Sequence, residues 1–147
     1  MVGLRLAAEI CSASISGNRV GSTNISFTPD GIRLPINASA DTGTAGSTAL
    51  LIQIALPCLL FSRNVPPEPS SLTLRGGTNA LSAPQIDYTQ HVLMHFLQHR
   101  LGLAPQLTIK RRGYYPKGGG EIVFALRRLA HSRSVMLRGT GAGDADM

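Results

Sequence analysis

The sequence has no tryptophan, only two cysteines and no apolar run long enough to cross a membrane. Its longest apolar stretch covers residues 49–61, well short of the roughly 20 residues that a spanning helix needs. The N-terminus lacks the charged and then apolar pattern of a secretion signal. The sequence therefore predicts an intracellular protein without a membrane span. Cys11 and Cys58 belong to no C-x-x-C or zinc-spaced pair, so both are expected to be buried reduced thiols.

Acidic residues are also few, since the chain has 8 of them against 14 lysines and arginines, with a formal net charge of +6. The excess is concentrated in residues 100–138, where Glu121 is the single acid. Such a stripe suits a polyanion, with nucleic acid as the first candidate, but a solvated basic surface has the same composition. Charge alone leaves both interpretations open. The basic residues of this segment are Arg100, Lys110, Arg111, Arg112, Lys117, Arg127, Arg128, Arg133 and Arg138.

Apolar periodicity and turn residues predict an α/β (α+β) chain with the element order αββ and then βαβαββ. The first group resembles the last three elements of the second, which indicates an internal repeat. Residues 1–34 are then the C-terminal half of a first βαβαββ unit, residues 35–128 a complete second unit, and residues 129–147 a loose tail. A chain that starts within a unit is expected to be a piece of a longer protein. The predicted helices cover residues 4–13, 49–61 and 84–100, and the predicted strands cover 25–28, 32–34, 36–41, 72–75, 107–112 and 121–126.

Two of these elements depend on local turn and capping signals. Residues 29–31 read Pro-Asp-Gly, a strong turn sequence, so residues 25–28 and 32–34 are predicted to pair as a hairpin. Ser82 is a candidate N-cap for the last helix, with Pro84 in the first turn and Asp87 near the positive end of the helix.

Gln53 is the single amide in the otherwise apolar predicted helix 49–61. If it is buried, its side chain needs a polar partner or costs about 1–3 kcal/mol. One interpretation is local: Pro57 has no N–H, which frees the Gln53 carbonyl four residues earlier, so a polar defect lies at a kink. The other interpretation is that Gln53 reaches a ligand at the edge of the helix.

Two loops of small residues are weaker candidates for ligand contact. Residues 42–47 precede the helix 49–61, and a helix N-terminus favours an anion, but the loop lacks a Walker lysine and helix capping is the simpler explanation. Gly76 and Gly77 end a predicted strand, where close approach to a ligand and ordinary turn chemistry are equally good explanations.

The histidines form a stripe with a possible metal interpretation. His91, His95 and His99 are spaced by four residues in the last predicted helix, and histidines at this spacing can share a zinc ion. No glutamate accompanies them in that helix, so a stripe at the boundary of the apolar face is favoured and no metal site is predicted. His131 stands alone in the tail.

The stretch from Arg112 to Ile122 carries the most unusual residues. Gly118 to Gly120 lie between two predicted strands and are first of all a turn. Arg112 and Lys117 could face phosphates, and Tyr114 and Tyr115 could stack on bases. Composition does not separate these interpretations.

Three blocks of the chain, taken in order, resemble the RNA 3′-terminal phosphate cyclase family. They are Ala-Asp-Thr-Gly-Thr-Ala-Gly-Ser at 40–47, followed by Gln53 and Leu56-Pro57; Gly-Gly-Thr-Asn at 76–79 with Ser-Ala-Pro-Gln-Ile-Asp-Tyr at 82–88; and Arg-Gly-Tyr-Tyr-Pro-Lys-Gly-Gly-Gly-Glu-Ile at 112–122. The resemblance covers roughly residues 3–126 and under half of a full-length member. It implies a fold of βαβαββ units with a small inserted domain further along.

The resemblance implies an ATP-dependent enzyme of the ligase class that uses a divalent metal such as Mg²⁺. Members adenylylate an active-site histidine and pass AMP to an RNA 3′-terminal phosphate, and the neighbouring 2′-hydroxyl then displaces AMP to leave a 2′,3′-cyclic phosphate. A histidine nucleophile divides a difficult phosphoryl activation into two easier steps. The implied partner is an RNA with a 3′-terminal phosphate. The implied process is RNA processing, in the nucleus of a eukaryote or otherwise in the cytoplasm.

Carried over to this sequence, the resemblance assigns Gln53 and Pro84 to contact with the adenine nucleotide, which favours the ligand interpretation of Gln53. Arg112 and Lys117 remain candidates for RNA or phosphate contact, and the glycine triplet is interpreted as hairpin geometry. No histidine of this chain matches the family nucleophile, so no catalytic residue is assigned.

The family's N-terminal glycine-rich segment, inserted domain and last repeat also have no counterpart in this chain. The expectation is therefore a truncated cyclase that is inactive alone. The alternative is a non-catalytic, cyclase-like factor of ribosome biogenesis. Residues 114–117 (Tyr-Tyr-Pro-Lys) and 83–88 (Ala-Pro-Gln-Ile-Asp-Tyr) favour the cyclase branch over it.

Overall fold

The computed structural model of the chain describes residues 1–62 and 66–127. Its main sheet has four strands in the order β3-β4-β6-β5, with β3 parallel to β4 and β6 antiparallel to both of its neighbours. Helix α2 connects β3 to β4, and a second helical segment connects β4 to β5. The order βαβαββ is therefore confirmed. The strands are β3 (Asn37–Asp41), β4 (Ser70–Gly76), β5 (Ala104–Arg111) and β6 (Gly120–Arg127).

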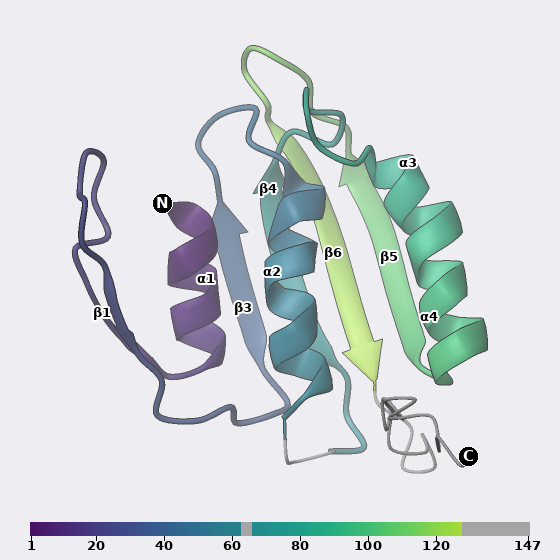
Figure 1. The fold of residues 1–147 in the computed structure, drawn as a ribbon. Helices are drawn as coiled ribbons and strands as arrows, with labels where there is room; N and C mark the ends of the chain where they lie inside the picture. The colour runs from purple at the N-terminus through teal and green to yellow at the C-terminus, as the bar shows by residue number, and fades with distance from the viewer. Residues whose placement is uncertain (63–65, 128–147) are drawn as a thin grey trace, which may run out of the picture.

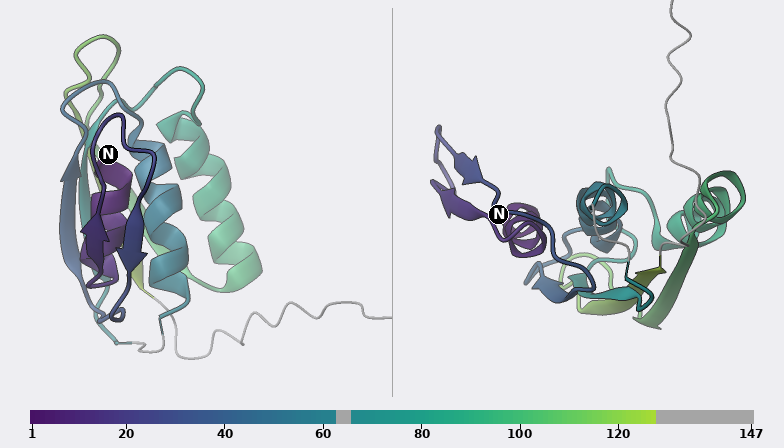
Figure 2. Two further views of the ribbon diagram at one scale, coloured as in Figure 1. Left: turned by 60° about the vertical axis from the view of Figure 1, so that its left-hand side comes forward. Right: turned by 90° about the horizontal axis from the view of Figure 1, so that it is seen from below.

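All of the described helices cover the same face of this sheet, so the molecule has two layers (Figures 1 and 2). Helix α1 (Val2–Ile10) packs against α2 (Thr48–Leu60) and β3. The second helical segment is continuous and consists of α3 (Ile86–Tyr88), one π-helical stretch η1 (Thr89–Leu93) and α4 (Met94–Leu101). It ends at Gly102, whose φ of 61° is the left-handed conformation that glycine adopts without strain.

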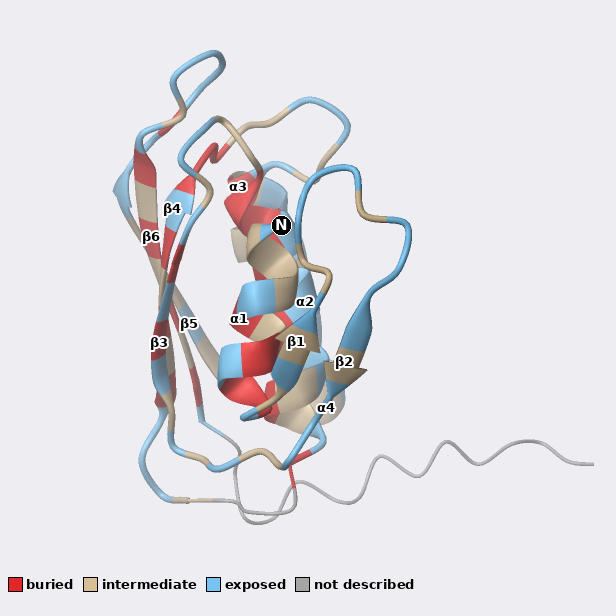
Figure 3. Ribbon diagram, turned by 90° about the vertical axis from the view of Figure 1, so that its left-hand side faces the viewer, coloured by how far each residue is buried: buried red, intermediate tan, exposed pale blue. Residues whose placement is uncertain are grey.

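The core lies between the helices and the sheet, where the buried positions face each other (Figure 3). Every second residue of β4 and β6 points into it, as the alternating burial of both strands shows. Leu72, Leu74 and Phe124 are completely buried there and meet apolar side chains of α1 and α2 such as Leu6 and Ile52. Burial of apolar area of this kind is the main favourable term of folding.

The predicted hairpin of residues 25–34 is wrong. Strand β2 (Ser26–Thr28) pairs antiparallel with β1 (Ser14–Ser16) in a separate two-stranded sheet, and residues 32–34 form no strand. The N–H groups of Asp30 and Gly31 both donate to the Cys11 carbonyl, at 3.3 and 3.1 Å, which ties the predicted turn to the end of α1. Ile32 and Leu34 instead pack, partly buried, against the main core, where removal of apolar area from water is favourable.

The predicted start of the last helix is also wrong. Ser82 has a φ of +56° and lies outside the helix, which begins at Ile86 after Gln85. The N–H of Ile86 donates to the Thr78 carbonyl at 2.9 Å, so a loop closure at the end of β4 satisfies it in place of a serine cap. Asp87 does lie in the first turn.

The cysteine prediction is confirmed for Cys11, whereas Cys58 is less buried than expected. Cys11 is buried and Cys58 half-buried; both are free thiols, with sulfur atoms 3.7 Å apart. No helix within residues 1–62 and 66–127 is long and apolar enough to cross a membrane. The repeat division at residue 34 stays a prediction, and residues 128–147, with the predicted tail, lie outside the described residues.

Candidate functional site

Three loops meet at one end of the main sheet, beyond the carboxyl ends of β3, β4 and β5 (Figure 1). They cover residues 42–47, 77–85 and 112–119, and they contain most of the three blocks that carry the family resemblance. Ligands of open α/β sheets bind at this edge, outside the carboxyl ends of the parallel strands. The fold therefore brings the three blocks together at the position where a ligand site is expected.

The first two loops are joined by backbone hydrogen bonds. The Gly77 N–H donates to the Gly46 carbonyl at 2.8 Å, and the Gly77 carbonyl accepts from the Thr48 N–H at 2.9 Å. A Cβ on Gly77 would collide with the backbone of Ala45, so this approach needs glycine. The loop after β3 is thus held against the end of β4 before α2 begins.

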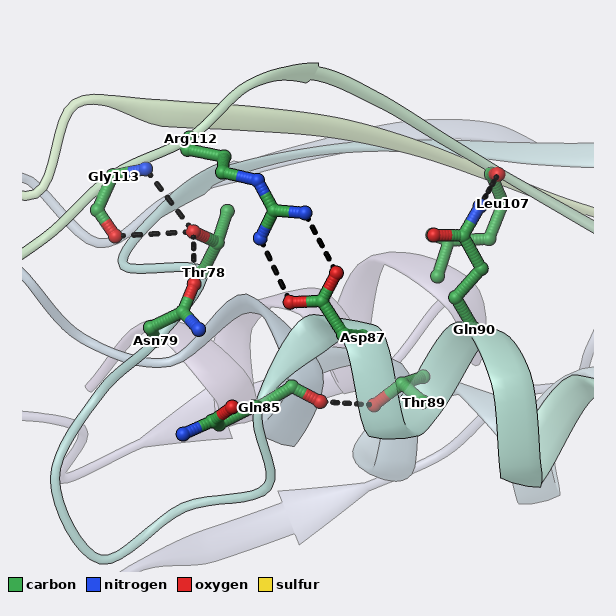
Figure 4. Close-up of polar contacts among 9 residues, drawn as sticks. All are labelled: Thr78, Asn79, Gln85, Asp87, Thr89, Gln90, Leu107, Arg112 and Gly113. Atoms are coloured by element: carbon green, nitrogen blue, oxygen red, sulfur yellow. Dashed lines mark hydrogen bonds and ion pairs between the residues drawn. The ribbon is translucent and has the colours of Figure 1, made fainter.

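The second and third loops are joined by Thr78 and Gly113 (Figure 4). The Thr78 N–H donates to the Gly113 carbonyl at 2.8 Å, and the Thr78 hydroxyl accepts from the Gly113 N–H at 3.1 Å. The same hydroxyl lies 2.8 Å from Oδ1 of Asn79 and can donate its proton there. Thr78 is completely buried, and a Cβ on Gly113 would collide with the backbones of Gly76 and Gly120. We refer to the paired Thr78 and Gly113 as the threonine–glycine clamp.

Arg112 and Asp87 form a two-pronged ion pair between the third loop and the start of α3 (Figure 4). Nη1 and Nη2 of Arg112 donate to the two carboxylate oxygens at 2.7 and 2.6 Å. The hydrogen bond from Arg112 is the main cause that lowers the pKa of Asp87 to about 2, and the carboxylate in turn raises the pKa of Arg112. Arg112, a candidate for RNA or phosphate contact, is thus engaged in an ion pair within the molecule, which holds the third loop against the start of α3.

A pocket of about 480 Å³ opens among the three loops on the side of α2, and we call it the apolar pocket. Small and apolar side chains dominate its walls. Neither Gln53 nor Pro84 lines it directly, but Leu50, one turn before Gln53, and Ala83, next to Pro84, both do. The lining residues are Thr44, Ala45, Gly46, Ser47, Leu50, Ala80, Leu81, Ala83, Tyr115 and Pro116.

Gln53 is exposed, so the interpretation of a buried amide at a kink does not apply, and its contact with a ligand stays a prediction. Its side chain is exposed on α2, on a side of the helix where Leu50 and Ile54 are also partly exposed. The amide can therefore bind water, and the cost of a buried unpaired amide does not arise. Pro84 is half-buried in the loop before α3. Gln53 thus lies one turn from a lining residue of the apolar pocket and Pro84 lies next to one, but neither lines the pocket itself.

A second, smaller cleft of about 210 Å³ lies where the loops meet the open face of the sheet, and we call it the Arg/Lys cleft. Lys117 lines it, as do Arg75 and Arg111, which sequence reasoning did not assign to a site. The only sequence signal for Arg75 is its position at the end of a predicted strand, where the alternation of Leu72 and Leu74 with polar residues makes it face outward. The lining residues are Asp41, Gly43, Thr44, Arg75, Gly76, Arg111, Lys117, Gly119 and Gly120.

The histidine stripe carries no metal centre in the described part of the chain. His91, His95 and His99 are exposed on η1 and α4, and the rings of His95 and His99 lie 4.0 Å apart. Residues 1–62 and 66–127 contain no group of three histidine, cysteine, aspartate or glutamate side chains that could hold a metal ion. The fourth histidine, His131, falls outside the described residues.

Comparison with known proteins identifies the same family as the three blocks. The sequence profile of the family described as RNA 3′-terminal phosphate cyclase matches residues 1–138. An RNA 3′-terminal phosphate cyclase of Methanosarcina barkeri is 46% identical over 122 residues, which are 81% of this chain and 34% of that protein. One of Ignicoccus hospitalis is 40% identical over 127 residues, 86% of this chain and 34% of that protein.

A eukaryotic relative, a probable RNA 3′-terminal phosphate cyclase of Dictyostelium discoideum, is 35% identical over 139 residues, 90% of this chain and 30% of that protein. The chain spans about a third of the length of these relatives. Family profile, relatives and clustered blocks agree, and the chain belongs to the RNA 3′-terminal phosphate cyclase family.

Proposed function

We propose that this chain supplies the nucleotide-binding wall of an RNA 3′-terminal phosphate cyclase, which converts an RNA 3′-phosphate to a 2′,3′-cyclic phosphate at the expense of ATP. The observation that carries the proposal is the clustering of the three family blocks around the apolar pocket at the carboxyl ends of β3 and β4. A pocket of about 480 Å³ has the size of a small-molecule site, for which roughly 300–1,000 Å³ is usual.

The lining of the apolar pocket suits an adenine base. Leu50, Ala83 and Pro116 offer apolar surface, and Tyr115 adds an aromatic ring that can stack on a purine. Ser47 and the loop before α2 lie at the N-terminus of a helix, whose dipole favours the negative charge of a phosphate. When bound, ATP supplies the adenylyl group that turns a phosphate oxygen into a leaving group.

In this arrangement the chain binds and orients the nucleotide. Gln53 reaches the ligand from α2, and Pro84 borders it from the loop before α3. We assign no residue of this chain to the divalent metal, because the described residues contain no suitable group of ligands. We also assign no nucleophile, since none of the four histidines matches the one that the family adenylylates.

A thermal melt with and without magnesium ATP tests nucleotide binding. At a concentration 100 times the Kd, ATP stabilises the folded chain by about 2.7 kcal/mol, so the melting temperature should rise clearly. Gln53→Ala should reduce this rise, whereas Gln98→Ala, on the exposed side of α4, should not. An unchanged melting temperature in ATP, or equal behaviour of the two variants, contradicts the proposed site.

A labelling experiment tests the assignment of chemistry. The chain is incubated with ATP labelled in the α-phosphate, and protein-bound label is measured after denaturation. We expect no covalent label, because the nucleophile lies outside the blocks that this chain contains. A stable adenylylated chain would refute that expectation. The relatives are named as cyclases, which supports this function over a non-catalytic role in ribosome assembly.

A further inference from the structure

We propose that the Arg/Lys cleft binds a phosphodiester group of the RNA strand, at a nucleotide other than the one whose 3′-phosphate reacts. The inference rests on the proposed function, because it assumes that RNA is the substrate. It assigns Arg75, Arg111 and Lys117 to the RNA backbone and gives the strand a path out of the reaction site.

The charges of the cleft favour a single anion. Three cationic side chains line it against one carboxylate, that of Asp41, whose Oδ1 accepts a hydrogen bond from the Gly43 N–H at 2.7 Å. Lys117 has no ion-pair partner among the residues that the structure describes. Its charge is therefore available to a ligand.

The two arginines are held in place while their terminal nitrogens stay available. Strand pairing sets both of them opposite Glu121, so that Glu121 lies between them on the sheet. Nε of Arg75 donates to Glu121 at 2.8 Å, and Nε of Arg111 donates to the Gly119 carbonyl at 2.6 Å. Each guanidinium has five N–H donors, and these bonds use the one on Nε. A cation that is already oriented loses less conformational entropy when it binds a phosphate.

Glycines line much of the cleft, and two of them leave open space above the main chain. Gly43, Gly76, Gly119 and Gly120 contribute backbone only. Added Cβ atoms on Gly43 and Gly119 would meet nothing within 4 Å, which shows open space above both residues. A phosphate can therefore approach the main chain as well as the three cations.

Size and position argue for a backbone phosphate in particular. At about 210 Å³ the cleft is smaller than a usual nucleotide pocket, and none of its lining residues is aromatic or large and apolar, so it offers a base little to stack on. Thr44 borders both the Arg/Lys cleft and the apolar pocket. A strand whose end lies beside the nucleotide can therefore pass an upstream phosphate over the cleft.

The test measures binding of a short single-stranded RNA to the full chain by fluorescence anisotropy, with the RNA ending in either a 3′-phosphate or a 3′-hydroxyl. Lys117→Ala should weaken the binding of both RNAs by the same factor, roughly five- to tenfold. It should also reduce the slope of log affinity against log salt by about 0.7, the value for one phosphate contact of a single strand. ATP stabilisation of the variant should equal that of the unaltered chain.

The matched control is Arg100→Ala, which removes the same charge from an exposed residue at the far end of α4. Equal losses for Lys117→Ala and Arg100→Ala would overturn the proposal, because they would indicate general attraction to a basic surface. A loss confined to the 3′-phosphate RNA, or a loss of ATP stabilisation, would overturn it too, by assigning the cleft to the reacting phosphate or to the nucleotide. If the unaltered chain binds ATP but no RNA, the cleft proposal fails alone; if it binds neither, the proposed function fails with it.

Discussion

Replacing Thr78 by valine should open the threonine–glycine clamp without changing the shape of the core. Valine has nearly the same volume as threonine but no hydroxyl, so the Gly113 N–H loses the acceptor that lies 3.1 Å away. Thr78 and Gly113 are both buried, and water therefore cannot replace that acceptor. A buried N–H without a partner costs about 1–3 kcal/mol.

Thr78→Ser is the matched control, because it keeps the hydroxyl and removes only a methyl group, at a cost of about 1 kcal/mol. We expect Thr78→Val to lower the free energy of unfolding by about 2–3 kcal/mol, the upper part of that range, because the Gly113 carbonyl and Oδ1 of Asn79 also lose the hydroxyl as a donor. For a domain of this size each kcal/mol shifts the melting temperature by roughly 4 °C. The valine variant should then melt roughly 8–12 °C below the unaltered chain, and the serine variant roughly 4 °C below it.

Urea unfolding followed by circular dichroism gives both free energies, and hydrogen exchange measured by NMR reports directly on the Gly113 amide. That amide should exchange faster in Thr78→Val and stay protected in Thr78→Ser. If the valine variant is as stable as the unaltered chain, or if serine costs as much as valine, the hydroxyl does not stabilise the loops and the clamp has been misinterpreted.

Three shorter predictions concern other described contacts. Gly113→Ala should destabilise the fold severely, because the added Cβ would meet the backbones of Gly76 and Gly120. Gly119→Ala should cost only about 1 kcal/mol, for its φ of +71°. Urea titration gives both free energies of unfolding, and equal costs would contradict this prediction. Asp87, with its pKa lowered from 3.8 to about 2, stabilises the fold above pH 3.8 and loses that contribution as the pH falls toward 2. Asp87→Asn should therefore weaken the pH dependence of the free energy of unfolding in that window. An unchanged pH dependence between pH 3.8 and 2 would argue against the ion pair. Burial and the neighbouring Cys11 raise the pKa of Cys58 to about 11, so iodoacetamide should label Cys58 far more slowly at pH 8 than a free thiol peptide, as mass spectrometry would show.

Much of the fold is predictable because its strands follow simple periodicity. Leu72 and Leu74 alternate with polar residues in β4, and this pattern identifies a strand with one buried face. The pairing of β2 could not be found in the same way. Ile32 and Leu34 look like a strand, but they pack against the core, and the turn before them is bonded to Cys11 at the end of α1. These contacts join residues that are distant in the sequence, so the local pattern does not contain them.

The candidate site was likewise predictable only in part from the sequence. Its loops are recognisable from residues such as Lys117, whereas the contacts that assemble them are not. Thr78 and Gly113 are 35 positions apart, and Gly113 contributes only backbone groups, which every residue has. Arg75 reaches the Arg/Lys cleft only because strand register sets it opposite Glu121. The apolar composition of the helix around Gln53 does not reveal that one side of α2 is exposed.

The joining of the three loops through main-chain contacts limits how this part of the molecule can be redesigned. Gly77 holds the loop after β3, and the threonine–glycine clamp holds the loop between β5 and β6, so the loop after β4 is joined to both of the others. Grafting one loop from a relative would leave it without the backbone partners that define its conformation. A chimera that exchanges all three together carries its own framework, so the cluster is the smallest unit that can be transferred between family members.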